Sequence, residues 1–176
     1  LLCSRLLDRA GRQSRAAAAA SLKLLSDHSP DLVHIHNLHG YWINQKNILI
    51  GLAELDIPIV WTLHDYWPIT GHCAYFEESG CEKWRVNCED CPQIGRYPKS
   101  YIDNSAKNFL EKQSIYDALD NVHIVTVSEH SRKLVEESIL KRFPVMTIYN
   151  SVDTSIFRPV MPAMQFSGKV VVGSVA

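Results

Sequence analysis

Short apolar segments with the composition of strands alternate with helical segments along most of this 176-residue chain. The strand-like segments are residues 31–36, 59–63, 122–127 and 144–149. The helical segments, identified by helix propensity and by the spacing of their apolar residues, are residues 14–26, 41–54, 105–119 and 129–140. Ser128 is expected to cap the last of them. Strands that alternate with helices are typical of a parallel sheet with right-handed crossover connections. An α/β fold with a Rossmann-like parallel sheet is therefore predicted.

The composition is that of a soluble globular protein, with 46% hydrophobic and 21% charged residues. A formal net charge of -1 gives no reason to expect nucleic acid or an anionic membrane as the main partner. The longest apolar run, residues 48–55, is shorter than the roughly 20 residues of a membrane-spanning helix and contains Glu54. Nucleic-acid binding and membrane spanning are thus not predicted.

The two ends of the chain suggest a fragment of a longer protein. Residue 1 is Leu, no signal-peptide pattern follows it, and residues 169–176, KVVVGSVA, have the composition of a strand that begins a second unit. The expected organisation is a Rossmann-like domain at 1–150, truncated at its N-terminus, an interdomain linker at 151–166, and the start of a truncated second domain at 167–176. A long Cys-rich loop, residues 64–104, interrupts the first domain.

The second strand-like segment runs directly into His64 and Asp65. Ligands of open α/β sheets bind at the carboxyl ends of the strands, so this pair is a candidate site. A His there can act as a base or as a hydrogen-bond donor, because its unperturbed pKa of about 6.5 lies near working pH. Asp65 could orient His64 or contact substrate hydroxyl groups. The alternative is that both residues only cap the following turn.

A second candidate group follows the first strand-like segment. Asn37, His39 and Gly40 are expected to line a sugar or acceptor pocket, where Gly40 lets the backbone approach a ligand closely. His34 and His36 are two residues apart, so both should lie on one face of the strand. A metal site of these three histidines is one interpretation. Hydrogen bonds from the imidazoles to neighbouring segments are the favoured one, because no cysteine is close.

Four of the five cysteines follow the pattern C-x7-C-x6-C-x2-C at Cys73, Cys81, Cys88 and Cys91. The C-x2-C spacing lets two thiolates bind one tetrahedral ion, and His72 could replace one thiolate. A structural zinc ion would also explain how so long a loop is ordered. Two disulfides or four free thiols are the alternatives. The lack of a signal-peptide pattern favours a reducing compartment and a metal.

Five aromatic residues are spread along the same loop, and they could form either a platform for sugar rings or a small apolar core. They are Tyr66, Trp67, Tyr75, Phe76 and Trp84. Packing is the favoured interpretation, because burying their large apolar area would stabilise a loop of this length.

The chain resembles a known family. The segments PDLVHIHNLHG, IPIVWTLHDYW, VHIVTVSEHSRKLV and IYNSVDTSIFRP follow one another in the order found in the N-terminal domain of family-4 glycosyltransferases of the two-domain, GT-B type. The segment GHCAYF…GCEKW…NCEDCP is similar to a subgroup of this family found in bacterial polysaccharide and capsule gene clusters. The resemblance covers the chain from about Asp31 to its last residue.

The resemblance implies two Rossmann-like domains facing a cleft, the first for the acceptor and the second for a nucleotide-diphospho-sugar donor. It implies transfer with retention at the anomeric carbon to a glycan or lipid-linked acceptor, without a catalytic cofactor. His64 matches the family position that contacts the donor sugar or assists at the reaction centre. Asn150 matches the Asn of the N-G-V-D type motif at the domain crossover, with Ser151 in place of Gly.

Two family motifs have no match here, namely the glycine-rich loop near the N-terminus and the Glu-x7-Glu pair of the donor domain. These residues alone are therefore expected to have no transferase activity. The expected location is the cytoplasm, and a lipid-linked acceptor would add peripheral contact with the inner face of the membrane. The rival interpretations are a non-catalytic, zinc-stabilised module that binds sugar or a partner, and a sugar-nucleotide epimerase of the same architecture. A zinc hydrolase is less favoured, because C-x2-C sites are mostly structural.

Overall fold

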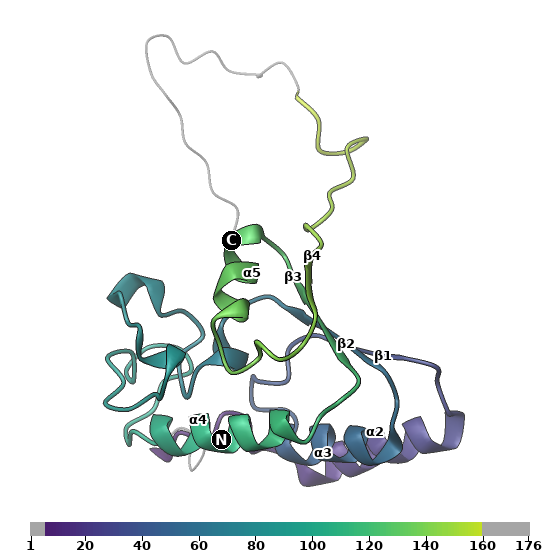
Figure 1. Cartoon of the computed structure of the whole chain (residues 1–176), viewed down its shortest axis with the longest axis horizontal. Helices are drawn as coiled ribbons and strands as arrows, with labels where there is room; N and C mark the ends of the chain where they lie inside the picture. The colour runs from purple at the N-terminus through teal and green to yellow at the C-terminus, as the bar shows by residue number, and fades with distance from the viewer. Residues whose placement is uncertain (1–5, 160–176) are drawn as a thin grey trace.

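A four-stranded parallel sheet forms the centre of the computed structural model, which describes residues 6–159. The strands lie side by side in the order β1-β2-β3-β4 (Figure 1). Their bounds are β1 Val33–Ile35, β2 Ile59–Leu63, β3 Val122–Thr126 and β4 Val145–Thr147. All three neighbouring pairs are parallel. The predicted α/β class and parallel sheet are confirmed, whereas the strand expected at 169–176 lies outside the described residues.

Four α-helices accompany the sheet, namely α2 Arg15–His28, α3 Gln45–Leu55, α4 Ser105–Asp117 and α5 Glu129–Glu136. Polar side chains begin three of them. Ser14 accepts a hydrogen bond from Ala17 N, Asn44 from Asn47 N, and Ser128 from Ser131 N. Such caps satisfy backbone N–H groups that have no partner within the helix. The cap predicted for the last helix from the sequence is therefore confirmed in kind and in place.

Two helix boundaries differ from the prediction for local reasons. The helix expected at 41–54 begins only at Gln45, because Asn44 acts as its cap, and Trp42 lies before the helix and is 52% exposed. The helix expected at 129–140 ends at Glu136. There the Ser138 hydroxyl donates to Val135 O and accepts from Leu140 N, which competes with the helical hydrogen bonds.

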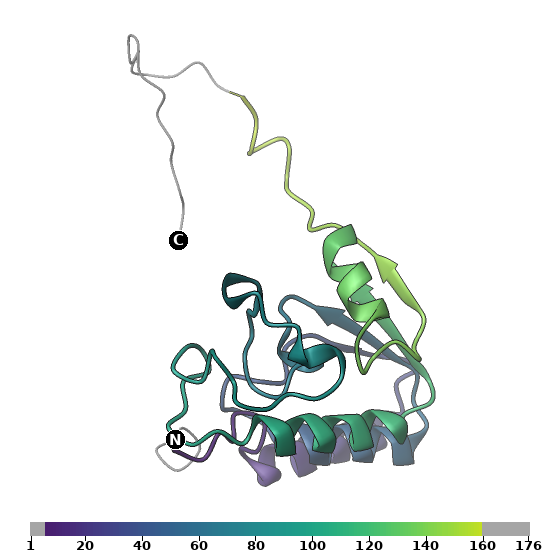
Figure 2. The same cartoon turned by 60° about the vertical axis from the view of Figure 1, so that its left-hand side comes forward.

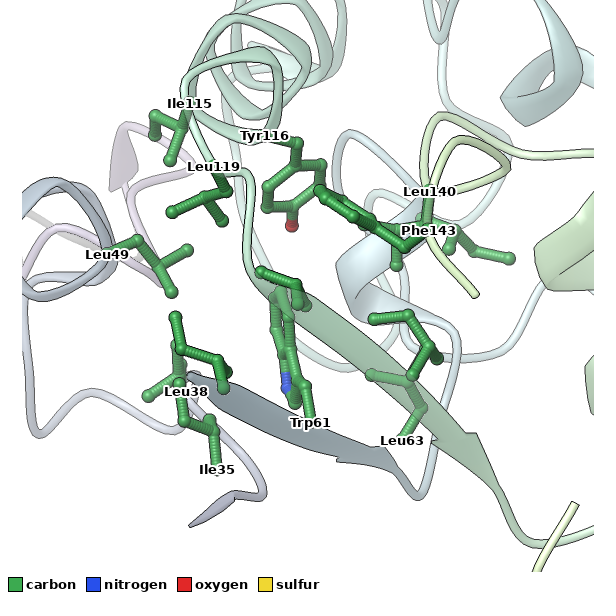
Figure 3. Packing of buried hydrophobic residues seen from close by; sticks show 14 of the residues in the cluster. Ile35, Leu38, Leu49, Trp61, Leu63, Ile115, Tyr116, Leu119, Leu140 and Phe143 are labelled. Atoms are coloured by element: carbon green, nitrogen blue, oxygen red, sulfur yellow. The ribbon is translucent and has the colours of Figure 1, made fainter. Parts of the chain in front are cut away.

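One hydrophobic core joins all four helices to one face of the sheet. Alternate residues of β2, namely Ile59, Trp61 and Leu63, contribute to this core from the centre of the sheet. Figure 3 shows Trp61 between the sheet and Tyr116 of α4, and the two ring centroids lie 5.7 Å apart. Side chains from every helix belong to the same cluster. The apolar residues at alternate strand positions are therefore explained by burial of one face of the sheet against the helices.

The other strand positions form a different surface. On β1 and β3 these positions include His34 and His123, and both are exposed. His36 and His64, just beyond the ends of β1 and β2, are exposed as well. Because successive side chains of a strand point to opposite faces, the apolar residues of the core and these histidines are separated by the sheet.

The loop at 64–104 contains three short 3-10 helices, η1 Trp67–Ile69, η2 Glu77–Ser79 and η3 Lys83–Arg85. Figure 2 shows this segment, in teal, beside α4 and α5. Ion pairs join the loop to α5 and to the turn that follows it, from Glu77 to His130 at 2.6 Å and from Arg85 to Glu137.

Most of the loop's aromatic residues are buried, as the packing interpretation predicts, but they lie in two clusters and not in one small core of the loop. Trp67, Phe76 and Trp84 are each at most 4% exposed. The rings of Phe76 and Trp84 stack with centroids 4.9 Å apart. Tyr75 is 58% exposed and belongs to neither cluster. Phe76 and Trp84 extend the main core of the domain, and Trp67 packs in a second cluster with Ala10 and Ala74, so burial of these rings attaches the loop to the rest of the chain.

A buried lysine ties the loop to α4. Lys112 Nζ donates to the carbonyl oxygens of Trp67 at 2.5 Å and Thr70 at 2.8 Å, and lies 3.2 Å from the Trp67 ring centroid. Burial lowers the pKa of Lys112 to about 7. The lysine therefore acts chiefly as a hydrogen-bond donor that satisfies two loop carbonyl groups.

We expect Lys112→Ala to lower the free energy of unfolding by about 2 kcal/mol, because both carbonyl groups lose their donor inside the protein. Lys107→Ala, at an exposed position of the same helix, is the matched control and should change this free energy by less than about 0.5 kcal/mol. Urea denaturation of the two variants measures the difference. Equal stabilities would show that the contacts of Lys112 do not hold the loop.

Candidate functional site

Two histidines meet at the carboxyl ends of β1 and β2. His36 Nδ1 lies 2.8 Å from His64 Nε2, and the two rings stack with centroids 5.1 Å apart. Beside them, His34 Nε2 lies 2.8 Å from the Thr62 hydroxyl oxygen. The register of the strands, which pairs Ile35 with Trp61, explains why these side chains meet. The result is a row of polar groups at the edge where ligands of parallel sheets bind.

The hydrogen bond between the two imidazoles uses one ring nitrogen of His64 and leaves the other available for a ligand. In a neutral pair, one ring nitrogen donates and the other accepts, so the bond restricts both the tautomer and the orientation of each ring. Within residues 6–159, the other nitrogen of His64, Nδ1, has no hydrogen-bond partner. This nitrogen can therefore donate to, or accept from, a ligand at the strand ends.

The core fixes the backbone of this site. Trp61, which is 1% exposed, donates from Nε1 to the carbonyl oxygen of His36 at 2.9 Å. His36 itself is exposed. A buried indole thus holds in place the chain segment that carries an exposed imidazole. This contact couples the position of the site directly to the packing of the core.

His39 and Asp65 form a separate, buried pair. His39 Nε2 lies 2.7 Å from Asp65 Oδ2. The two residues are buried, with 7% of His39 and 8% of Asp65 exposed. His39 Nδ1 lies 3.2 Å from the Tyr97 hydroxyl, and the Trp67 amide donates to Asp65 Oδ1. The pair therefore holds the turn after β1 against the turn after β2 and the Cys-rich loop.

This arrangement corrects one expectation about Asp65. Its partner is His39, while the partner of His64 is His36, so Asp65 does not orient His64. Residues 64 and 65 are neighbours at the end of a strand and point to opposite sides, which explains the separation. A contact between Asp65 or His39 and a substrate stays a prediction.

The remaining residues predicted for the pocket lie at or near strand ends. Gly40 has φ +96°, a backbone angle that favours glycine, although a Cβ there would meet no atom closer than 4.0 Å. Asn37 and Asn150 are exposed. Contact of these three residues with a substrate stays a prediction.

The three histidines near β1 do not form one group. His34 and His36 share a face, as predicted, and each contacts a residue of the neighbouring chain segment. His39 is turned into the buried pair instead. The favoured interpretation, hydrogen bonds to neighbouring segments, is therefore confirmed. The contribution of His36 to the site was missed, because the sequence shows the spacing of residues on one strand but not the register between two strands.

The four cysteines of the loop are free thiols that line one pocket. Contact between Cys73 and Cys91 lowers the pKa of Cys91 and raises that of Cys73. Burial raises the pKa of Cys88 to about 11. Among the described residues, no group of three or more His, Cys, Asp or Glu side chains has the arrangement of a metal site.

The fold is an α/β domain with polar side chains at the ends of its parallel strands, and sequence comparison gives the family. The profile of Glycosyltransferase Family 4 matches residues 3–156. The chain belongs to this family, as its resemblance predicted. No solved structure matches the chain. In the part of the chain that the structure describes, no helix has the length and apolar character needed to cross a membrane.

One relative is a protein of Escherichia coli (strain K12) described as "Putative colanic acid biosynthesis glycosyl transferase WcaC". The two sequences are 36% identical over 92 residues. This alignment covers 49% of the chain and 22% of the relative. The chain thus matches about a fifth of the length of that protein.

The buried His39–Asp65 pair should show strong coupling in a double-mutant cycle. We expect His39→Ala and Asp65→Ala to couple by about 1 kcal/mol or more, because each variant alone leaves a buried polar partner unsatisfied. The exposed pair of His130 and Glu77 is the matched control, with an expected coupling below about 0.5 kcal/mol. Denaturant unfolding of the single and double variants measures both cycles, and equal coupling energies would contradict the structural role of the buried pair.

Proposed function

We propose that the protein containing this chain transfers a sugar from a nucleotide-diphospho-sugar to a glycan or lipid-linked acceptor during polysaccharide biosynthesis. Membership of the glycosyltransferase family and the described function of the related protein support the reaction class. The observation that carries the proposal is the exposed pair of His36 and His64 at the ends of neighbouring parallel strands. The reaction is proposed to proceed with retention at the anomeric carbon and without a catalytic metal.

In this proposal His64 contacts the donor sugar or its leaving phosphate. Its Nε2 is engaged with His36, so Nδ1 is the atom that faces the reacting groups. A donor group held at this position can stabilise charge that develops in the transition state. His36 acts as a positioning residue, because it restricts the ring orientation and tautomer of His64 without itself needing to touch the substrate.

The proposed acceptor side is formed by the turn after β1. Gly40 and Asn37 are exposed on this turn, and the buried contact of His39 with Asp65 holds it against the end of β2. Acceptor and reacting centre are thereby kept in a fixed relation. Holding two reactants in the right geometry can supply a large part of the barrier reduction in a transfer reaction.

A further domain is proposed to bind the donor and to pack against the segment that follows β4. Figure 1 shows this segment, in yellow-green, leading away from the sheet. Several of its apolar side chains are more than half exposed, namely Ile148, Tyr149, Val152, Ile156 and Phe157. Apolar residues gathered in this way are typical of a surface that contacts another domain. Asn150 lies within this segment, which suits a role at the hinge between the domains.

We expect His64→Ala in the full-length protein to lower kcat by about 100-fold or more, because the transition state loses a positioned hydrogen-bond donor or acid. His123→Ala, at an exposed histidine on β3, is the matched control and should leave kcat unchanged. Transfer of radiolabelled sugar from the nucleotide sugar to an acceptor measures kcat. Wild-type kcat in His64→Ala would remove His64 from the reaction.

The positioning role of His36 has its own signature. His36→Ala should lower kcat less than His64→Ala does and should also shift the pH dependence of kcat, because the tautomer of His64 is no longer held. A change in KM alone would indicate a substrate-binding role instead.

Product analysis also separates the reaction classes, because an epimerase would convert one nucleotide sugar to another without an acceptor.

We expect the 176-residue chain alone to show no sugar transfer, because binding of both substrates requires both sides of the cleft. The assay compares this chain with the full-length protein at equal concentration, using a panel of nucleotide sugars and the same acceptor extract. Transfer by the chain above a blank without protein would contradict the need for a donor domain.

A further inference from the structure

The cysteines of the loop converge on one small pocket together with a histidine. Cys73, Cys81, Cys88 and Cys91 all line it, and His72 lies beside them. The side chains of Cys73 and Cys91 contact each other, and the Gly71 amide donates to Cys88 Sγ at 3.2 Å. The cavity between them has a volume of about 10 Å³, which is the space of a single small ligand. Residues separated by 18 positions in the sequence thus share one site.

His72 supplies an independent observation that points to a ligand. The residue is 1% exposed, and its Nδ1 lies 2.5 Å from Asp8 Oδ1. Its Nε2 is buried and, among the described residues, has no hydrogen-bond partner. Leaving a buried polar atom unsatisfied costs about 1–3 kcal/mol, so such an atom requires an explanation. A carboxylate that accepts the Nδ1 proton leaves the Nε2 lone pair available, as is usual for a metal-binding imidazole.

The alternatives explain fewer of these contacts. Two disulfides would join the sulfur atoms in pairs but would leave His72 Nε2 without a partner. Free thiols would place three or four sulfur atoms in one pocket with only weak hydrogen bonds between them. A soft or borderline divalent cation bound to thiolate and imidazole ligands accounts for the sulfur atoms and for the unpartnered nitrogen together.

We propose that this pocket binds one Zn²⁺ through the thiolates of Cys73, Cys88 and Cys91, with Cys81 or His72 as the fourth ligand. Cys73 contacts Cys91, and both Cys73 and Cys91 lie near Cys88 in the pocket. Cys81 lies near Cys88 and His72 lies near Cys91 in the same pocket, so either group can complete the ligand set. The side chains as oriented do not already form a metal site, so metal binding requires them to reorient.

Four protein ligands make the zinc site structural, because no position stays open for a substrate. The binding energy of the ion would stabilise the folded loop. The ion would take no part in the proposed reaction at the strand ends. The site therefore goes beyond the proposed sugar transfer. Its test also does not depend on an activity assay.

The direct test is the metal content of the full chain purified under reducing conditions without added metal. We expect about one zinc per chain by elemental analysis, and less than about 0.1 in the double variant Cys88→Ser/Cys91→Ser. His28→Gln, at an exposed histidine of α2, is the control and should keep the zinc. Loss of zinc in either Cys81→Ser or His72→Gln identifies the fourth ligand, and retention in both would contradict the proposed ligand set.

Two further measurements need no variant and so do not depend on whether a variant folds. Replacement of zinc by Co²⁺ should give the visible absorption of a tetrahedral thiolate complex. Titration with a thiol reagent should show that some of the five thiols in the chain become reactive only after a chelator is added, namely four with Cys81 as the fourth ligand or three with His72. Absence of metal would overturn the proposal, whether all five thiols react at once, as free thiols do, or only one reacts, as expected for two disulfides. Zinc retained in the double variant would show adventitious binding elsewhere.

Discussion

The burial of alternate residues on β2 is the constraint on which the rest of the structure depends. Trp61 lies at its centre, and burying a side chain of this kind contributes roughly 2–3 kcal/mol. The same alternation places Thr62 and His64 on the opposite face. A slip of one residue in the pairing would expose Trp61 and bury His64. The energy of the core therefore determines which side chains are presented at the carboxyl end of the strand.

The Cys-rich loop is held both by buried polar contacts and by its buried aromatic residues. Lys112 satisfies loop carbonyl groups, Asp65 binds His39, and Asp8 binds His72. Each contact joins the loop to a different part of the chain. Buried polar groups stabilise a structure only when their partners are present, so these contacts make the loop position specific. A zinc ion on the thiol side would act in the same way, and with His72 as its fourth ligand it would also satisfy the remaining nitrogen of that residue.

Sequence patterns were sufficient for the elements of the fold but not for the contacts between them. The apolar run at 59–63 and the cap at Ser128 lie where they were predicted, because both signals are local. The meeting of His36 with His64 depends on the register of two strands, which neither segment encodes alone. Lys112 lies in a helix with few apolar residues, and nothing in its neighbours distinguishes it from exposed lysines. Its burial follows from the loop that packs on it.

The central claim is that His64, held in place by its hydrogen bond with His36, contacts the sugar donor. Nitrogen NMR of the histidine side chains in full-length protein, with and without nucleotide sugar, tests this most directly. The account predicts that the signals of His36 and His64 shift on addition of the nucleotide sugar and that those of His123 do not. Unchanged signals for the pair at saturating nucleotide sugar would show that the donor binds elsewhere and would contradict the account.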